Sequence, residues 1–185
     1  MVLCLNCGCV GHADDKGEMK ELSPSLYCPN CQSDKNVIDV DEEIAWYIYK
    51  LNKAGFKTKF SCAGHPWEKY CLGYIVFQED YPEIKEYFDK YQPKYLDLEI
   101  NLTGHFKIDE MTTCYLTQKE IDESEFYRDN FIPNGQKNYT IRVKGRYEAL
   151  IENLGNNVFI DDPNSLMIHH NFHSDMKNLV NRLCN

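Results

Sequence analysis

The sequence predicts an α+β protein in which an N-terminal zinc ribbon is followed by a mixed, largely antiparallel sheet packed with helices. Two Cys-x-x-Cys pairs near the N-terminus indicate the ribbon. Segments that alternate polar and apolar residues, with helical spacings between them, indicate the sheet and its helices. We therefore expect a zinc ribbon over residues 1–37 and an α+β domain over residues 38–185.

The composition is that of a folded, acidic protein. Apolar residues make up 43% and aromatic residues 13% of the chain, which excludes a disordered or fibrous class. The formal net charge of −9 repels a polyphosphate backbone, so we do not expect a nucleic-acid partner. No run of about 18 apolar residues is present, so we expect no membrane partner. No signal peptide precedes the cysteines, which favours a cytoplasmic location, where paired cysteines hold metal more often than they form disulfides.

The expected ligands of one structural Zn²⁺ are Cys4, Cys7, Cys28 and Cys31. Thiolates at positions i and i+3 fit a tight turn, and two such turns supply four tetrahedral ligands. Gly8 relaxes the backbone after the first turn. A site with four thiolates has no open coordination position, so its expected role is folding or recognition. Cys9 and His12 leave the ligand choice open, because either could replace Cys7 or bind a second ion.

A helix is expected over residues 41–54, because its apolar residues recur at spacings of four and three. Those residues are Ile44, Ile48 and Leu51. Gly55 then fits the position after a helix end. Residues 56–60 alternate with period two and predict a strand.

The next two elements are a strand and a helix. A continuous apolar run over residues 74–77 predicts a buried strand. Asp80, with Glu83 three residues later, predicts the capped start of a helix.

Residues 96–103 contain the clearest strand signal in the chain. Four apolar residues alternate there with four polar residues, which predicts one dry and one wet face in an antiparallel sheet. Thr117 and Glu120 have the spacing of a capping box, and residues 139–144 alternate again.

The C-terminal part is expected to contain two helices and two short strands. The first helix covers residues 147–154, and the strands cover residues 158–160 and 166–168. Ser174 is expected to cap the final helix.

The segment Ser-Cys-Ala-Gly-His, residues 61–65, is a second candidate site because it follows directly on an expected strand. Gly64 permits close backbone approach, so this segment could surround an anion with amide groups.

Three interpretations of this segment remain open. Cys62 could be a nucleophile that His65 activates. Alternatively, Cys62, His65 and Cys71 could ligate a second metal ion. In the third interpretation, the backbone and Ser61 bind a small ligand.

Further candidates lie outside this segment. His105 stands at the end of the clearest strand and could face the site. Arg142 and Lys144 share one face of a strand and could jointly contact a phosphate, although a solvated strand face is the commoner arrangement. A group of imidazoles precedes the final helix, at His169, His170 and His173. His169 and His173 have a chelating spacing on a helix, but surface histidines in a loop are the more frequent case.

Residues 44–77 resemble two groups of proteins. Their central segment, Leu-Asn-Lys-Ala-Gly-Phe-Lys-Thr-Lys-Phe-Ser-Cys-Ala-Gly-His, is similar to the helix, strand and Ser-Cys-Ser-Gly-Arg loop of the wybutosine-synthesis methyltransferases of the TYW three type. That resemblance implies S-adenosylmethionine as cosubstrate, a tRNA guanosine as substrate, and an active-site loop carried over to Ser61, Cys62 and Gly64. The segment also resembles uncharacterised bacterial and phage zinc-ribbon proteins that share a Ser-Cys-x-Gly-His core.

The leading hypothesis is a zinc-containing protein that binds a small nucleotide-like or adenosyl ligand at residues 61–65. Its expected ligand contacts are Ser61, Cys62, Gly64, His65, His105, Arg142 and Lys144. In the phage–host context that the resemblance suggests, such a protein could sequester a nucleotide signal. The first alternative is a methyltransferase-like or Cys/His-dependent enzyme with Cys62 and His65 as catalytic residues. The second is an interaction module that docks a protein partner through the ribbon.

Overall fold

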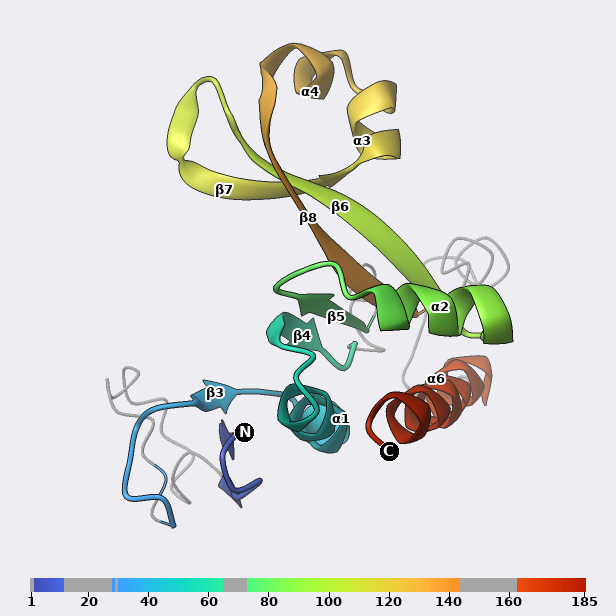
Figure 1. Cartoon of the computed structure of the whole chain (residues 1–185). Coiled ribbons are helices and arrows are strands. Elements are labelled where there is room, and N and C mark those ends of the chain that lie inside the picture. Colours follow the sequence, from blue (N-terminus) through green and yellow to red (C-terminus); the bar gives the residue numbers. More distant parts are fainter. Residues whose placement is uncertain (1, 12–27, 29, 65–72, 144–162) are drawn as a thin grey trace.

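A computed structural model describes residues 2–11, 28, 30–64, 73–143 and 163–185. Figure 1 shows a central antiparallel sheet with helices against one face, a small ribbon near the N-terminus and a lobe that extends beyond the helices. The expected α+β class with an antiparallel sheet is confirmed. None of the described helices combines the length and the apolar character needed to cross a lipid bilayer.

The main sheet has five strands, and every neighbouring pair is antiparallel. The strands in spatial order are β4 (Thr58–Cys62), β5 (Tyr74–Phe77), β8 (Phe131–Val143), β6 (Leu96–Phe106) and β7 (Asp109–Thr117). Strand β8 is therefore inserted between two strands that precede it in the chain. The expected strands at residues 74–77 and 96–103 are confirmed. The strand expected over residues 56–60 begins and ends two residues later, at Thr58 and Cys62.

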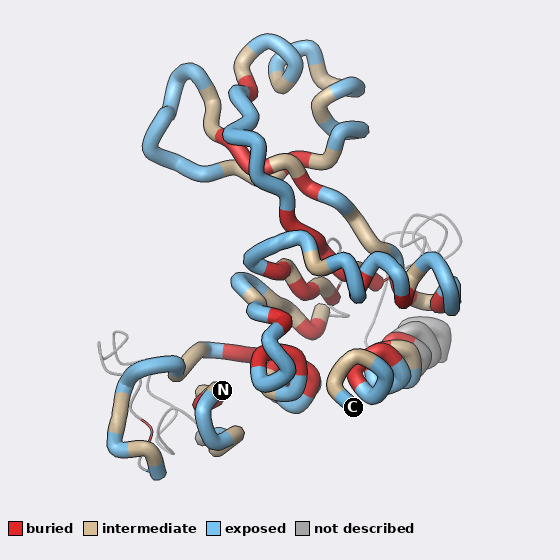
Figure 2. The backbone as a smooth tube through the Cα atoms, in the orientation of Figure 1, coloured by how far each residue is buried: buried red, intermediate tan, exposed pale blue. Residues whose placement is uncertain are grey.

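Three helices pack on one face of this sheet: α1 (Glu42–Lys53), α2 (Pro82–Tyr91) and α6 (Pro163–Leu183). The core between helices and sheet includes Ile44, Ile48, Leu51, Ile75, Phe77, Ile84, Ile141, Phe172, Met176 and Leu179. The three apolar residues predicted for the first helix all belong to this core. Figure 2 shows that buried residues gather where the helices meet the sheet, whereas most of the lobe is exposed.

Two helix starts differ from the sequence-based prediction. Helix α2 begins at Pro82 with Tyr81 as its N-cap, so Asp80 is not the capping residue. A proline at the first helical position is itself a start signal. Backbone N–H groups in the first turn have no partner within the helix, so a residue without an N–H loses no hydrogen bond there. The expected strand at residues 166–168 is wrong, because these residues lie inside α6, and Ser174 is also interior to that helix. A three-residue apolar run has the same pattern in a helix and in a strand, so the sequence could not separate the two.

The lobe consists of the end of β6, β7, the start of β8, and the two short helices α3 (Gln118–Glu123) and α4 (Glu125–Asn130). The predicted capping box is confirmed: the Thr117 hydroxyl accepts the Glu120 N–H at 3.2 Å, and the Glu120 carboxylate accepts the Thr117 N–H at 2.7 Å. A small aromatic cluster fills the lobe, formed by Phe106, Phe126, Tyr127 and Phe131.

The ribbon is a three-stranded sheet in the order β2 (Val10–Gly11), β1 (Val2–Cys4) and β3 (Val37–Asp39). Leu3 of β1 is buried in the same core as the helices. The ribbon therefore shares its apolar contacts with the rest of the protein. The helix expected over residues 147–154 and the strand expected over residues 158–160 lie outside the described residues.

Gly104 allows β6 and β8 to approach closely at the base of the lobe. A Cβ atom at this position would lie 2.2 Å from the carbonyl oxygen of Ile132. We expect Gly104→Ala to lower the free energy of unfolding by about 3 kcal/mol, because the backbone of β8 must move. Gly135→Ala is the control: Gly135 has a φ of +84° and open space around its Cα, so only conformational strain of about 1 kcal/mol applies. Urea denaturation measures both variants, and equal losses would contradict the close approach.

Candidate metal centre and the outer face of the sheet

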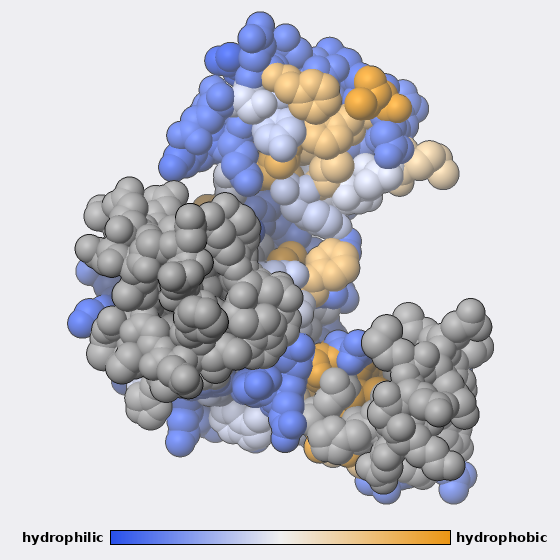
Figure 3. Space-filling model, turned by 180° about the vertical axis from the view of Figure 1, so that it is seen from behind, coloured by the Kyte–Doolittle hydropathy of each residue, from blue (hydrophilic) through white to orange (hydrophobic). Residues whose placement is uncertain are grey.

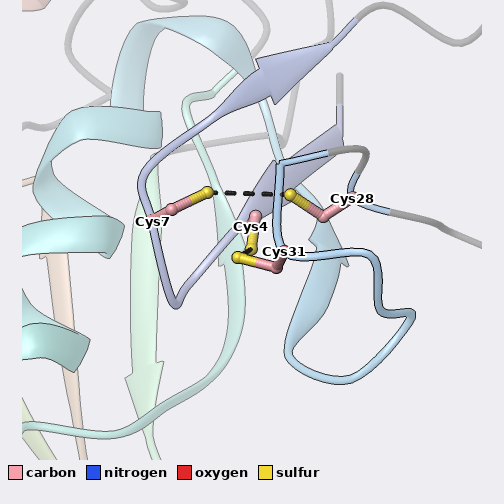
Figure 4. A group of neighbouring side chains, drawn as sticks. All are labelled: Cys4, Cys7, Cys28 and Cys31. Carbon is pink, nitrogen blue, oxygen red and sulfur yellow. Dashed lines mark hydrogen bonds between the residues drawn. The ribbon is translucent and has the colours of Figure 1, made fainter.

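Four cysteine sulfurs converge in the ribbon (Figure 4), from Cys4, Cys7, Cys28 and Cys31. All four sulfur atoms lie within 4.8 Å of one another. The Cys4 and Cys31 sulfurs are 3.8 Å apart, and the Cys7 and Cys28 sulfurs are 3.6 Å apart. A tetrahedral ion with Zn–S bonds of about 2.3 Å places its sulfurs roughly 3.8 Å apart. The cluster thus has the donor set and the spacing to hold a metal ion, and all four cysteines are free of disulfides.

The two Cys-x-x-Cys turns have the same backbone geometry. In the first turn the Cys4 N–H donates to the Cys9 carbonyl at 2.9 Å, and in the second the Cys28 N–H donates to the Ser33 carbonyl at 2.8 Å. The residue after each second cysteine has a positive φ, +75° at Gly8 and +48° at Gln32. Both turns therefore present their sulfurs in the same way, which explains why two separate segments can build one centre.

The electrostatics of the cluster favour a cation among the sulfurs. Burial raises the pKa of Cys4. Hydrogen bonds from the amides of Cys7 and Asn6 and from neighbouring thiols together outweigh this effect and lower the pKa to about 7. Hydrogen bonds with the Cys7 and Cys4 sulfurs, together with burial, raise the pKa of Cys31 to about 12. Thiolates this close repel one another, so all four ionise only when a metal ion neutralises them.

The four-cysteine cluster packs against α1. A Cβ atom at Gly8 would lie 3.0 Å from the Tyr49 ring, so the first turn packs directly on this helix. The Lys53 ammonium also donates to the Asn6 carbonyl at 3.4 Å. Cys9 lies outside the cluster, with its sulfur near the Val10 carbonyl, and His12 lies outside the described residues.

We call the sheet face opposite α1, α2 and α6 the outer face. Strand pairing places Cys62 opposite Tyr74, Tyr74 opposite Arg142 and Arg142 opposite Asp97, so these four side chains form one row across this face. Ser61 pairs with Ile75 and therefore points to the helix side. The structure thus brings Cys62 and Arg142 onto one face and places Ser61 on the other.

Other sequence-predicted residues lie outside the described residues or elsewhere in the sheet. His65, Cys71 and Lys144 belong to the parts of the chain that the structure does not describe. His105 pairs with Ile132 in the lobe, eight residues along β6 from Asp97. At about 3.4 Å per strand residue, this separation is on the order of 25 Å. His105 is therefore not brought next to Cys62.

The three C-terminal histidines lie in helix α6 rather than in a loop, and the structure describes the role of one of them. His173 lies on α6, where its Nδ1 is 3.0 Å from the Tyr47 hydroxyl, and that hydroxyl donates to the His173 carbonyl. This side chain therefore joins α6 to α1. The side chains of His169 and His170 lie outside the described residues.

The end of β4 is tied to the start of α1. The Ala63 N–H donates to the Asp41 carboxylate at 2.8 Å, and the Gly64 N–H lies 3.4 Å from the Cys62 sulfur. Gly64 has a φ of +85°, a conformation in which a glycine is favoured. These contacts hold the Cys62 side chain at the edge of the outer face.

Arg142 makes an ion pair with Glu99 from the adjacent strand, and its guanidinium carbon lies 5.8 Å from the centre of the Tyr74 ring. The side chain of Arg142 is 43% exposed. It can therefore contact a ligand in solvent while Glu99 holds it in place.

Sequence reasoning missed a group of buried polar residues on the same face. They are Asn101, Thr103, Asn138 and Thr140. The alternation in residues 96–103 predicted that its polar side would be wet, but Asn101 and Thr103 are buried. A signal was present, because uncharged polar residues replace the acidic ones in the second half of that strand.

Comparison with known proteins assigns no family to the chain. No protein-family model, no curated protein and no solved structure matches it. The function therefore has to be inferred from the residues and their arrangement.

Replacement of any one cluster cysteine by serine should abolish tight metal retention, because three thiolates leave the centre incomplete. Cys7→Ser is the most direct choice, since Cys7 is exposed and its replacement perturbs packing least. Cys9→Ser is the matched control two residues away, and it should retain one metal equivalent. Inductively coupled plasma mass spectrometry of the purified proteins measures both. Metal loss from Cys9→Ser with retention in Cys7→Ser would contradict the ligand set.

Proposed function

We propose that the chain is a zinc-stabilised protein that binds a small nucleotide-like ligand on the outer face of its sheet, next to Cys62. The zinc assignment is carried by the sulfur spacing of 3.6–3.8 Å in a set of four cysteines. The ligand assignment is supported by the row that contains Cys62, Tyr74 and Arg142.

Zinc in this centre would be structural. Four thiolates fill the tetrahedral positions and leave none for a substrate. The ribbon leads through β3 directly into Asp41, whose carboxylate accepts the Ala63 N–H. Zinc binding therefore stabilises the segment next to Cys62 as well as the ribbon itself.

The row on the outer face offers complementary groups for a nucleotide. Arg142 presents a guanidinium for a phosphate, and the ion pair with Glu99 orients it. The Tyr74 ring beside it offers an apolar surface for a base or sugar. The chain's net charge of −9 disfavours a long polyanion, so a small ligand is the better match than a nucleic acid.

An enzyme that uses the same site is the second candidate. The thiol of Cys62 lies on the outer face and 3.4 Å from the Gly64 N–H, an environment that suits a nucleophile. A methyltransferase-like activity would use the same segment. An interaction module that uses the ribbon to dock a protein partner is a third candidate.

The proposed location is the cytoplasm, where thiols remain reduced and available to zinc. Sequestration of a nucleotide signal in a phage–host conflict is one role that such binding would serve.

The binding proposal is tested with zinc-loaded full-length protein and two probes, adenosine 5′-monophosphate and S-adenosylmethionine, by isothermal titration calorimetry. Arg142→Gln should weaken adenosine 5′-monophosphate binding at least fivefold, because a charge-assisted contact is lost. Arg182→Gln is the matched control. Arg182 also lies over a tyrosine ring, that of Tyr91, but it belongs to α6 and not to the outer face. Equal effects of the two substitutions, or no saturable binding of either probe, would refute the proposal.

Cys62→Ala separates a binding protein from an enzyme. For a binding protein, affinity is retained within about threefold and mass spectrometry detects no conversion of either probe. An enzyme that hydrolyses a probe, or that transfers the methyl group of S-adenosylmethionine to adenosine 5′-monophosphate when both are present, would do so in the parent protein and lose that turnover in the variant while still binding the probe. Detection of such turnover would replace the binding proposal by the enzyme.

A further inference from the structure

The middle of the outer face is polar and yet buried. Its four side chains, Asn101, Thr103, Asn138 and Thr140, are between 1% and 7% exposed. Their direction follows from strand alternation: Tyr139 and Ile141 belong to the core on the helix side, so Asn138 and Thr140 point the other way.

The sheet curls so that its two edges approach each other on this face. Strands β4 and β7 are its two edges, but the rings of Phe60 and Tyr115 on these edges have centroids only 6.4 Å apart. The Lys59 ammonium also donates to the Tyr115 hydroxyl. A register shift between Thr58 and Phe60 marks a bulge in β4, and bulges increase local twist.

The aromatic pair therefore lies on the concave side of the sheet together with the polar group. Phe60 is in register with Val76, which pairs with Thr140, and Tyr115 pairs with Thr103. Figure 3, which views the molecule from behind, shows its surface hollowed between the lobe and the body.

The hydrogen bonding of the polar group is incomplete. The Asn101 amide donates to the Thr140 hydroxyl at 2.7 Å. Within the part of the chain that the structure describes, the buried side-chain oxygen of Asn138 has no hydrogen-bond partner. Most buried acceptors in proteins have a donor, so this oxygen is an acceptor that a ligand or an ordered water molecule would satisfy.

We propose that this concave side holds the nucleobase of the ligand, with Asn138 Oδ1 accepting a hydrogen bond from a base N–H and the rings of Phe60 and Tyr115 contacting the base. This inference rests on the proposed function, because it assigns a subsite to the same ligand. All four buried side chains are uncharged, which suits a neutral heterocycle. The charged pair Arg142–Glu99 lies nearer the Cys62 end, where the phosphate is placed.

The inference is tested by calorimetry on the unmodified, zinc-loaded protein with two pairs of probes. Adenosine 5′-monophosphate is compared with its N6,N6-dimethyl derivative, and uridine 5′-monophosphate with its 3-methyl derivative. Each methylated probe lacks the base N–H donor. Loss of at least tenfold in affinity upon methylation is expected for the nucleotide that binds more tightly.

Asn138→Leu provides the second measurement. It removes an unpaired acceptor and keeps the branched shape of the side chain, although leucine is larger than asparagine, and affinity for the unmethylated probe should fall at least tenfold. Unchanged affinity in a variant that still folds and retains its zinc would show that Asn138 makes no contact with the base, and the inference would be wrong.

Failure of the base subsite and failure of the proposed function give different results in these experiments. If a nucleotide binds but neither methylation nor Asn138→Leu weakens it, the proposed function survives and the base subsite is refuted. If no nucleotide binds to the unmodified protein, the proposed function and the subsite both fail.

Discussion

The backbone pairing of β8 with β5 and β6 is the constraint on which the remaining structure depends. Ten residue pairs join β8 to β6, from Val143 opposite Leu96 to Phe131 opposite Phe106. Because side chains alternate along a strand, this register sends Ile141 to the helices and Thr140 to the outer face. A slip of one residue would exchange the two faces. After a register shift between Leu102 and Gly104, the same two strands pair again in the lobe, so core, outer face and lobe share one pair of strands.

The ribbon is linked to that sheet through a short chain of contacts. Leu3 is buried in the common core, and the Gly8 backbone packs on the Tyr49 ring of α1. At the other end of the link, the Asp41 carboxylate at the start of α1 accepts the N–H of Ala63. A metal ion that closes the four-sulfur cluster would therefore stabilise two places at once, the ribbon and the end of β4. This arrangement gives a closed metal site an indirect influence on a surface that could bind a ligand.

Local patterns were sufficient for the elements whose signals are contained within a few residues. Helix α1, strands β5 and β6, and the capping box of Thr117 were predicted from period and spacing. The errors occurred where a local pattern is ambiguous. The apolar run at residues 166–168 fits a helix as well as a strand, and the start of α2 is set by Pro82 rather than by Asp80.

The sequence by itself indicated the four cysteines of the cluster, because two cysteines at a spacing of three fit one tight turn. It also determined the fold class, since alternation and helical periodicity are properties of short segments. Only the tertiary structure decided that Cys62 and Arg142 share a face, that Phe60 meets Tyr115 across the curled sheet, and that Asn138 is buried beside them. These features depend on which distant strands become neighbours and on how strongly the sheet twists, and no local spacing encodes either of these.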